Sequence, residues 1–279
     1  MTVRALIGLL QRLPAWAALI VWTLVVVVPL YALVVSCFKS TAEIYASPMG
    51  LPNSWSFGNF ASAWEQAKLG RTLINSLLVT CVSVIVTLVV SAMAAYPLSR
   101  YELGWNNWVL GLFLAGIMLP IRLASVELFT LMKQLNLIDS IFGLMCVYVA
   151  VRIPFAIFIF ANFMRVLPRE MEEAARIDGA GEVRILFSII RPLISPAISI
   201  VAIFTAIGVW NDFFFPLIFI FDDANKTVPL AITGFVGQFR TDWGMVFASL
   251  AISMAPVLIM YILLARQIRE GVSASGAFK

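Results

Sequence analysis

The chain contains no histidine, only three cysteines and few charged residues. Of its 279 residues, 12% are charged and 62% are hydrophobic. Without histidine, the chain lacks the commonest metal ligand and the commonest general base of enzymes. Cys37, Cys81 and Cys146 stand alone in apolar runs, without the spacing of a disulfide framework or a metal site, so we expect three buried thiols. The sequence therefore predicts no catalytic residue and no metal site.

Long basic runs and glycine-rich phosphate loops are also absent. The net charge is only +4, and no block of basic residues indicates a nucleic-acid partner. No Walker-type loop is present, so the chain itself is expected to bind neither nucleotide nor another cofactor. The apolar segments hold no clustered carboxylates, which argues against a membrane enzyme.

Long apolar segments dominate the sequence. A membrane span needs about 20 predominantly apolar residues, and we expect six spans, at approximately 16–38, 72–98, 105–120, 141–164, 196–221 and 244–265. The third is short, and beyond Pro120 the chain turns amphipathic, which predicts an interfacial helix after it. No small-residue cleavage site follows the first run, which indicates a retained span and not a signal peptide. The expected fold is an all-α polytopic membrane protein with a single domain over residues 1–279.

A polar loop at 165–195 interrupts the second half of the chain. Pro168 can be the first residue of a helix, because the amide hydrogen it lacks would have no partner there. Three glutamates of the next turn suit the positive end of the helix dipole. Gly179 and Gly181 are expected to end this helix, and a second amphipathic run continues from Val183 to Pro192. The loop therefore predicts a short helix, a glycine joint and a second helix between two spans.

The loop resembles the EAA motif of ABC-importer permeases through Glu173-Ala174-Ala175, Gly179, Ile189 and Pro192. In that family the motif forms a cytoplasmic coupling helix that docks into a groove on the ATP-binding subunit. The resemblance assigns docking to six residues: Glu173, Ala174, Ala175, Ile177, Asp178 and Gly179. Arg191 departs from the family, which usually has leucine there. The alternative is an ordinary amphipathic helix on the bilayer surface.

Two charged residues, Arg152 and Asp212, lie inside predicted spans. Charges in the bilayer are costly and usually face a protein interior or a cavity. At about 1.5 Å of rise per residue, the two lie within roughly one helical turn of the same depth. We hypothesise that they pair or share a wet cavity; the alternative is that each reaches the interface separately.

Asp212 belongs to the run Trp210–Pro216, which resembles the fifth-span signature of the carbohydrate-importer branch. Aromatic rings can stack on the C–H faces of a sugar, and amide and carboxylate groups can accept from its hydroxyls. The alternatives are helix packing for this run and interhelical hydrogen bonding for Asn75. The candidates for the substrate pathway are Asn75, Arg152, Asn211, Asp212, Phe213 and Phe214.

The C-terminal tail, Gln267–Lys279, resembles the C-terminal end of permeases of the same branch. With the loop and the fifth span, the resemblance therefore covers nearly the whole chain. It is nearest to the second permease subunit of maltose-type sugar importers. It implies a permease subunit of an ATP-driven ABC importer for a sugar or sugar-like solute. The implied partners are ATP-binding subunits that hold ATP and Mg²⁺, a second related permease, and an extracytoplasmic solute-binding protein that lands partly on the external segment 39–71. The alternative for this segment is a loop that merely connects two spans. Membrane lipid would surround the spans.

Lysine and arginine are more numerous on the side of the two termini, but mainly because of the 165–195 loop, so the positive-inside rule decides little alone. The resemblance places this side, with both termini, in the cytoplasm and the chain in the cell's inner membrane. Two alternative functions stay open. One is an importer permease for a glycerol-phosphate-type solute, and the other is an ion-coupled secondary transporter that uses Asp212 as its ion site.

Overall fold

The computed structural model describes residues 3–102, 104–237 and 241–276, except for the side chains of residues 3–13, 260, 261 and 263–276. The tail Gln267–Lys279, which contributes to the resemblance, therefore lies outside the described side chains. The regular secondary structure of the described residues is helical, as the all-α prediction requires, apart from one isolated bridge between Val236 and Thr241. Contacts divide the chain into one unit of Met1–Leu69 with Ile232–Met254 and another of Gly70–Ala231 with Ala255–Lys279.

The first unit contains the expected external segment. After α1, Val3–Ser36, the segment forms α2, Thr41–Ala46, and α3, Gly58–Gln66. The ammonium group of the fully buried Lys39 donates to the carbonyls of Ser47 and Gly50, and this fixes the turn after α2. The Asn59 amide donates to the carbonyls of Cys37 and Lys39, both at 2.8 Å. The segment is therefore held by buried polar contacts and is more than a connecting loop.

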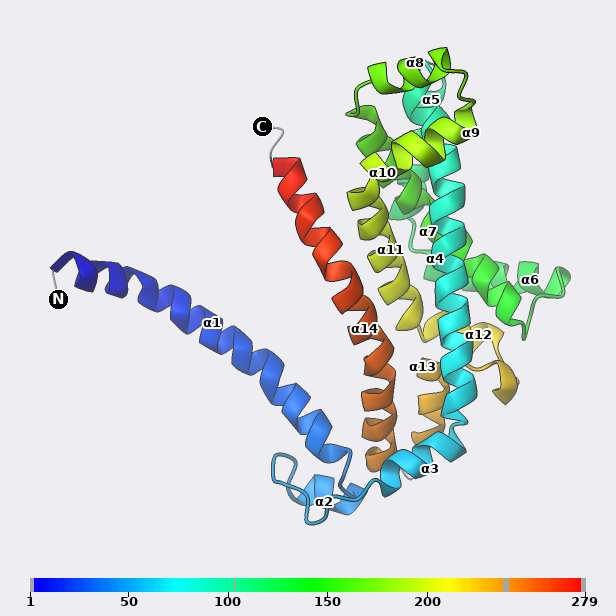
Figure 1. Cartoon of the computed structure of the whole chain (residues 1–279). Coiled ribbons are helices and arrows are strands. Elements are labelled where there is room, and N and C mark those ends of the chain that lie inside the picture. Colours follow the sequence, from blue (N-terminus) through cyan, green and yellow to red (C-terminus); the bar gives the residue numbers. More distant parts are fainter. Residues whose placement is uncertain (1–2, 103, 238–240, 277–279) are drawn as a thin grey trace. The chain divides into compact units, whose positions relative to one another are not determined.

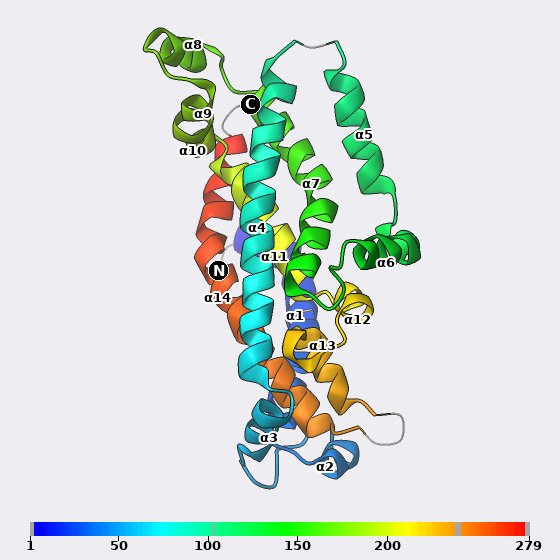
Figure 2. The ribbon, with the colours of Figure 1, turned by 90° about the vertical axis from the view of Figure 1, so that its right-hand side faces the viewer.

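The second unit carries the polar loop and the candidate pathway residues. Its longest helix, α4, begins at the boundary between the units and lies beside α7 and α11 (Figures 1 and 2). The helices of this part of the chain are α4 Leu69–Arg100, α5 Asn106–Met118, α6 Ser125–Gln134, α7 Ile141–Arg165, α8 Glu170–Ile177, α9 Glu182–Ile185, α10 Arg191–Leu193, α11 Ser195–Trp210, α12 Phe214–Phe219 and α13 Val228–Ile232. A last helix, α14, runs from Trp243 to Gly276 and contributes to both units.

Three helical segments among the described residues are long and apolar enough to cross a membrane: Pro14–Ser36, Leu69–Arg100 and Ile141–Arg165. Two bent pairs, Asn106–Met118 with Ile121–Gln134 and Glu182–Leu193 with Ser195–Trp210, raise the number to as many as five if each counts as one span. Trp243–Ile259 is a shorter apolar helix. The count of six spans stays a prediction.

The break in the first of these pairs follows local sequence. Pro120 forces the preceding Leu119 into an extended conformation, with ψ of 123°, because a helical residue would clash with the proline ring. The helices on either side of this break meet at 81°. Farther along, α11 ends at Trp210, and α12 starts anew at Phe214. The run Trp210–Pro216 is thus a break between two helices.

Two apolar clusters hold the second unit together. One joins the ends of α4 and α7 to α9–α11 around Tyr96, Phe160 and Ile190. The other lies around Tyr148 and Phe219, where α4, α6, α7 and α12 meet. The expectation of three buried thiols is wrong for two positions: Cys37 is buried, but Cys146 is partly exposed and Cys81 is exposed on the outer side of α4. A helix in a bilayer can present apolar side chains outward, so an apolar run does not imply burial in protein.

Candidate functional site

The polar loop folds as α8, a glycine turn and α9. Two predicted details are wrong. Pro168 precedes the helix, which begins at Glu170, and Gly181 has an ordinary φ of −76° at the N-cap of α9. Gly179 does end α8, with φ of +82°. Its amide donates to the carbonyl of Arg176, and the amide of Ala180 donates to the carbonyl of Ala175. This is a Schellman motif, in which glycine supplies the left-handed residue.

The outer face of α8 carries most of the residues that the resemblance assigns to docking. Glu173, Ala174, Asp178 and Gly179 are exposed, and Ile177 is 86% exposed. Ala175 is half-buried against the cluster of apolar residues beneath the loop. An isoleucine exposed to this degree beside small residues leaves an apolar surface that none of the described residues covers.

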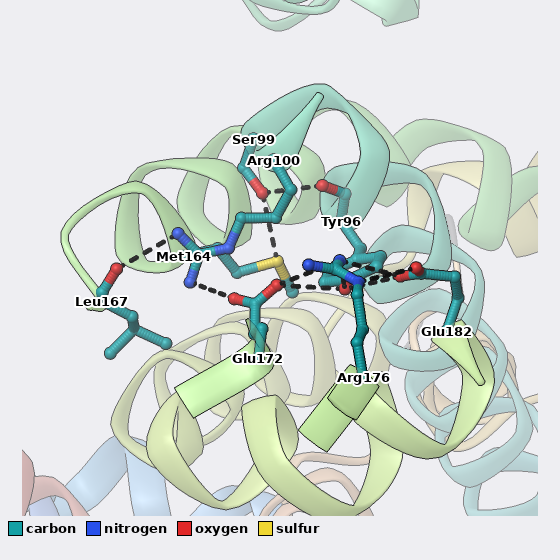
Figure 3. A network of polar contacts seen from close by, with 8 residues as sticks. All are labelled: Tyr96, Ser99, Arg100, Met164, Leu167, Glu172, Arg176 and Glu182. Atoms are coloured by element: carbon teal, nitrogen blue, oxygen red, sulfur yellow. Dashed lines mark hydrogen bonds and ion pairs between the residues drawn. The ribbon is translucent and has the colours of Figure 1, made fainter. Parts of the chain in front are cut away.

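The inner face of α8 is tied to the end of α4 by a buried ion pair (Figure 3). Arg100 lies 2.5 Å from a carboxylate oxygen of Glu172, and the two side chains are 4% and 3% exposed. Arg100 also donates to the carbonyl of Leu167 at 3.2 Å. Removing one member of such a pair leaves an uncompensated buried charge, which is strongly destabilising. The pair therefore fixes α8 on α4.

A second group of polar side chains connects the two helices of the loop. The Tyr96 hydroxyl lies within hydrogen-bonding distance of the carboxylates of Glu172, at 3.1 Å, and Glu182, at 2.8 Å. Arg176 donates to Glu182 at 3.1 Å. This hydrogen bond from Arg176 is the main cause that lowers the pKa of the Glu182 carboxyl, and the Tyr96 hydroxyl lowers it further. The same contact raises the pKa of Arg176. Both groups are therefore charged at neutral pH.

Sequence reasoning missed this network. It assigned the charges of the loop to a surface and did not name Tyr96, Arg100 or Glu172 among the site residues. One signal was available: Glu172 and Arg176 are four residues apart, so they lie on the same face of a helix, and that face is turned away from Ile177. Arg100 lies just after the predicted span 72–98, on the same side of the membrane as the loop.

Among the pathway candidates, Asp212 has the most contacts. Its carboxylate accepts from the Tyr148 hydroxyl at 2.9 Å and from the amide of Phe215 at 3.1 Å, so it caps α12. It also forms an ion pair with Arg122 at 3.5 Å. The Arg122 guanidinium lies 5.1 Å from the centroid of the Phe214 ring, which is within the range of a cation–π contact. Arg122 thus joins Asp212 to Phe214. It was not among the candidates that the sequence analysis named.

The hypothesis was that Arg152 and Asp212 pair or share a wet cavity. The ion pair is wrong, because Asp212 pairs with Arg122 instead, and the shared cavity stays a prediction. No carboxylate among the described residues forms an ion pair with Arg152. Its guanidinium lies against Gly208, where an added Cβ would be 2.0 Å from a terminal nitrogen. Arg152 also lines a cavity of about 500 Å³ beside α5 and α7. The comparison of depths considered only the two spans that carry Arg152 and Asp212. The residue that pairs with Asp212, Arg122, lies on a third segment, the short helix η1, Ile121–Ala124.

The remaining candidates are not brought together with Asp212. The Asn75 amide donates to the carbonyls of Ala224 and Lys226, at 2.9 and 3.0 Å, and thus ties α4 to another segment. The exposed Asn211 donates to the carbonyl of Ile207 in its own helix. Phe213 is exposed. The geometry therefore groups Asp212 and Phe214 with Arg122 and Tyr148 and gives Asn75 a role in packing.

Solved structures share this fold. A crystal structure of a bacterial ABC transporter involved in the import of the acidic polysaccharide alginate matches with a TM-score of 0.80 and 19% identity, over 92% of this chain and 96% of that one. The same type of alginate transporter in complex with a pentasaccharide-bound periplasmic protein matches with a TM-score of 0.67 and 14% identity, over 94% of this chain and 96% of that one. At these identities the likeness shows the fold alone.

Curated relatives match over most of their length. The diacetylchitobiose uptake system permease of Streptomyces coelicolor is 36% identical over 94% of this chain and 87% of its own. The melibiose/raffinose/stachyose import permease of Bacillus subtilis is 31% identical over 90% and 91%. The sulfoquinovosyl glycerol transport permease of Agrobacterium fabrum is 29% identical over 85% and 84%. Residues 88–270 match the family model described as the inner membrane component of binding-protein-dependent transport systems. The chain belongs to this family and is a membrane transport subunit, not an enzyme.

Proposed function

We propose that the chain is a permease subunit of an ATP-driven ABC importer for a sugar or sugar-like solute. The observation that carries the proposal is the full-length similarity to the diacetylchitobiose permease. Carbohydrates also appear in the names of the melibiose and sulfoquinovosyl glycerol permeases. The family membership and the exposed face of α8 support the subunit role.

In this proposal α8 docks into a groove on an ATP-binding subunit. Ile177 and Ala174 supply the apolar contact, and Glu173 and Asp178 meet basic groups around it. The exposure of all four supports this assignment. ATP and Mg²⁺ are held by that subunit and not by this chain. Closure of the ATP-binding subunits would move α8 and shift the spans between inward-facing and outward-facing states, a two-state equilibrium biased by ligand.

The complete importer would contain a second related permease and an extracytoplasmic solute-binding protein. The alginate transporter complex includes a periplasmic protein, and the matched family is named for such dependence. The 39–71 segment, which α2 and α3 make rigid, is the proposed external landing surface. The proposed topology places α8 and both termini in the cytoplasm.

The proposed solute pathway includes Asn211, Asp212, Phe213, Phe214 and Arg152. Exposed aromatic rings beside a carboxylate suit the hydroxyls and C–H faces of a sugar. A glycerol-phosphate-type or other anionic solute is the second candidate. The reason is that the guanidinium of Arg152, which has no carboxylate partner among the described residues, lines a cavity. The contacts of Asp212 with Arg122, Tyr148 and the backbone argue against its use as the ion site of a secondary transporter.

Reconstitution tests the proposal. The chain is co-expressed with a candidate partner permease, an ATPase and a solute-binding protein, and the complex is placed in liposomes. We expect uptake of a labelled oligosaccharide that requires both ATP and the binding protein. A complex that lacks the binding protein is the control. Solute uptake by this chain alone, driven by a proton or sodium gradient without ATP, would contradict the proposal.

A further inference from the structure

Helix α4 has polar ties to the rest of its unit at both ends. At the end near α8, Arg100 forms its buried ion pair with Glu172 and donates to Leu167, and Tyr96 reaches Glu172 and Glu182. These contacts join α4 to a loop that is 67 or more residues farther along the chain. They surround α8 on its inner face, opposite the exposed docking face (Figure 3).

At its other end, α4 is tied to the segment that follows α12. The Arg71 side chain donates to the carbonyl of Ala224 at 2.9 Å, and Asn75 donates to the carbonyls of Ala224 and Lys226. The buried Ser76 hydroxyl accepts from the amide of Val228 at 2.9 Å. This segment continues from α12, which Asp212 caps. The N-terminal end of α4 is therefore hydrogen-bonded to the segment 224–228, which follows the proposed pathway residues of α12 in the chain.

Between these ends, the buried face of α4 carries hydroxyls that have no hydrogen-bond partner among the described residues. They repeat at helical spacing and are Thr80, Ser83, Thr87 and Ser91. Small side chains on this face permit close helix packing. Without directed bonds to neighbouring helices, the middle of α4 can shift without breaking a polar contact, whereas its ends cannot.

We propose that α4 transmits the movement of the α8–α9 loop to the segment 224–228, with Arg100 and Glu172 as positioning residues at one end and Asn75 at the other. This inference rests on the proposed function, because it takes α8 as the element that the ATP-binding subunit moves. A buried ion pair is suited to this role, since separation of the two charges in a protein interior is costly. When α8 moves, Arg100 follows, and α4 pulls on the carbonyls that Asn75 holds.

The test measures ATP hydrolysis and solute uptake separately in the reconstituted complex. In the folded fraction of Arg100→Gln, Glu172→Gln and Asn75→Ala, we expect ATPase binding to persist and the solute transported per ATP hydrolysed to fall about tenfold. The reversed pair, Arg100→Glu with Glu172→Arg, is expected to recover part of the coupling. A merely structural role would lower the amount of complex but would leave this ratio unchanged.

A matched control lies close by. Arg169 and Glu102 also join the loop to the segment after α4, at 3.4 Å, but their side chains are 55% and 85% exposed. Exposed ion pairs contribute little, so Arg169→Gln should leave the ratio unchanged. Wild-type coupling in any one of the three test variants would overturn the proposal, and so would loss of ATPase binding by the folded fraction of Arg100→Gln or Glu172→Gln. Failure of the wild-type chain to bind any ATPase would instead overturn the proposed function.

Discussion

At the scale of single residues, two adjacent glutamates have different environments. Glu172 is 2% exposed and pairs with Arg100, whereas Glu173 is exposed on the docking face of α8. One helical step rotates a side chain by about 100°, because an α-helix has 3.6 residues per turn. The two residues should therefore affect different properties of the protein.

We expect Glu172→Gln to destabilise the chain by about 3–5 kcal/mol, because it leaves the buried guanidinium of Arg100 without its counter-charge. Glu173→Gln should leave stability unchanged and weaken ATPase binding. Thermal unfolding of the purified complex and pull-down of the ATPase measure the two effects. An equal loss of stability in both variants would contradict the assignment of inner and outer faces.

At the scale of elements, the turn between α8 and α9 depends on backbone conformation at one glycine. Gly179 has φ of +82°, and a Cβ there would meet no atom within 4 Å. Replacing Gly179 is therefore costly because of its backbone conformation, not because the new side chain would clash with its neighbours. Left-handed backbone costs L-residues roughly 1–2 kcal/mol, and β-branched side chains are the least suited to it.

We expect Gly179→Val to abolish transport while the chain still inserts, because the docking helix can no longer end in its Schellman motif. Gly181→Val is a matched control: its surroundings are equally open, but φ is −76°, which valine adopts readily. Membrane fractionation measures insertion, and the ATPase assay with uptake measures coupling. Normal solute-stimulated ATP hydrolysis in Gly179→Val would refute the role of the turn.

The sequence predicted features that depend on neighbours along the chain. The glycine joint at Gly179 and the change to a second helix after Pro120 follow from local preferences, and the structure has both. It could not predict which of Glu172 and Glu173 is buried, because the rotation of α8 is set by Arg100, which lies 72 residues earlier. It also chose the wrong partner for Asp212, since depth along a span carries no information about a third helix. Contacts between distant segments account for each of these errors.

At the scale of the whole molecule, the described surface is strongly apolar. Large apolar side chains are exposed along α1, α4 and α5, including Trp22, Ile74, Trp108 and Met118. Monomeric soluble proteins rarely expose contiguous apolar patches of more than a few hundred Å². Lipid would cover part of this surface, and the second permease of the proposed importer would cover a further part.

We therefore expect the isolated chain to be unstable in detergent and to become stable when its partner permease is co-expressed. The physical reason is mass action: a partner that binds only the folded chain stabilises it by an amount that grows with the partner's concentration. Size-exclusion chromatography of the chain expressed alone and with its partner measures the difference. Co-expression with an unrelated membrane protein of similar size is the control. A monodisperse, transport-competent preparation of this chain alone would contradict the prediction, and it would restore the secondary transporter as the better explanation of its apolar surface.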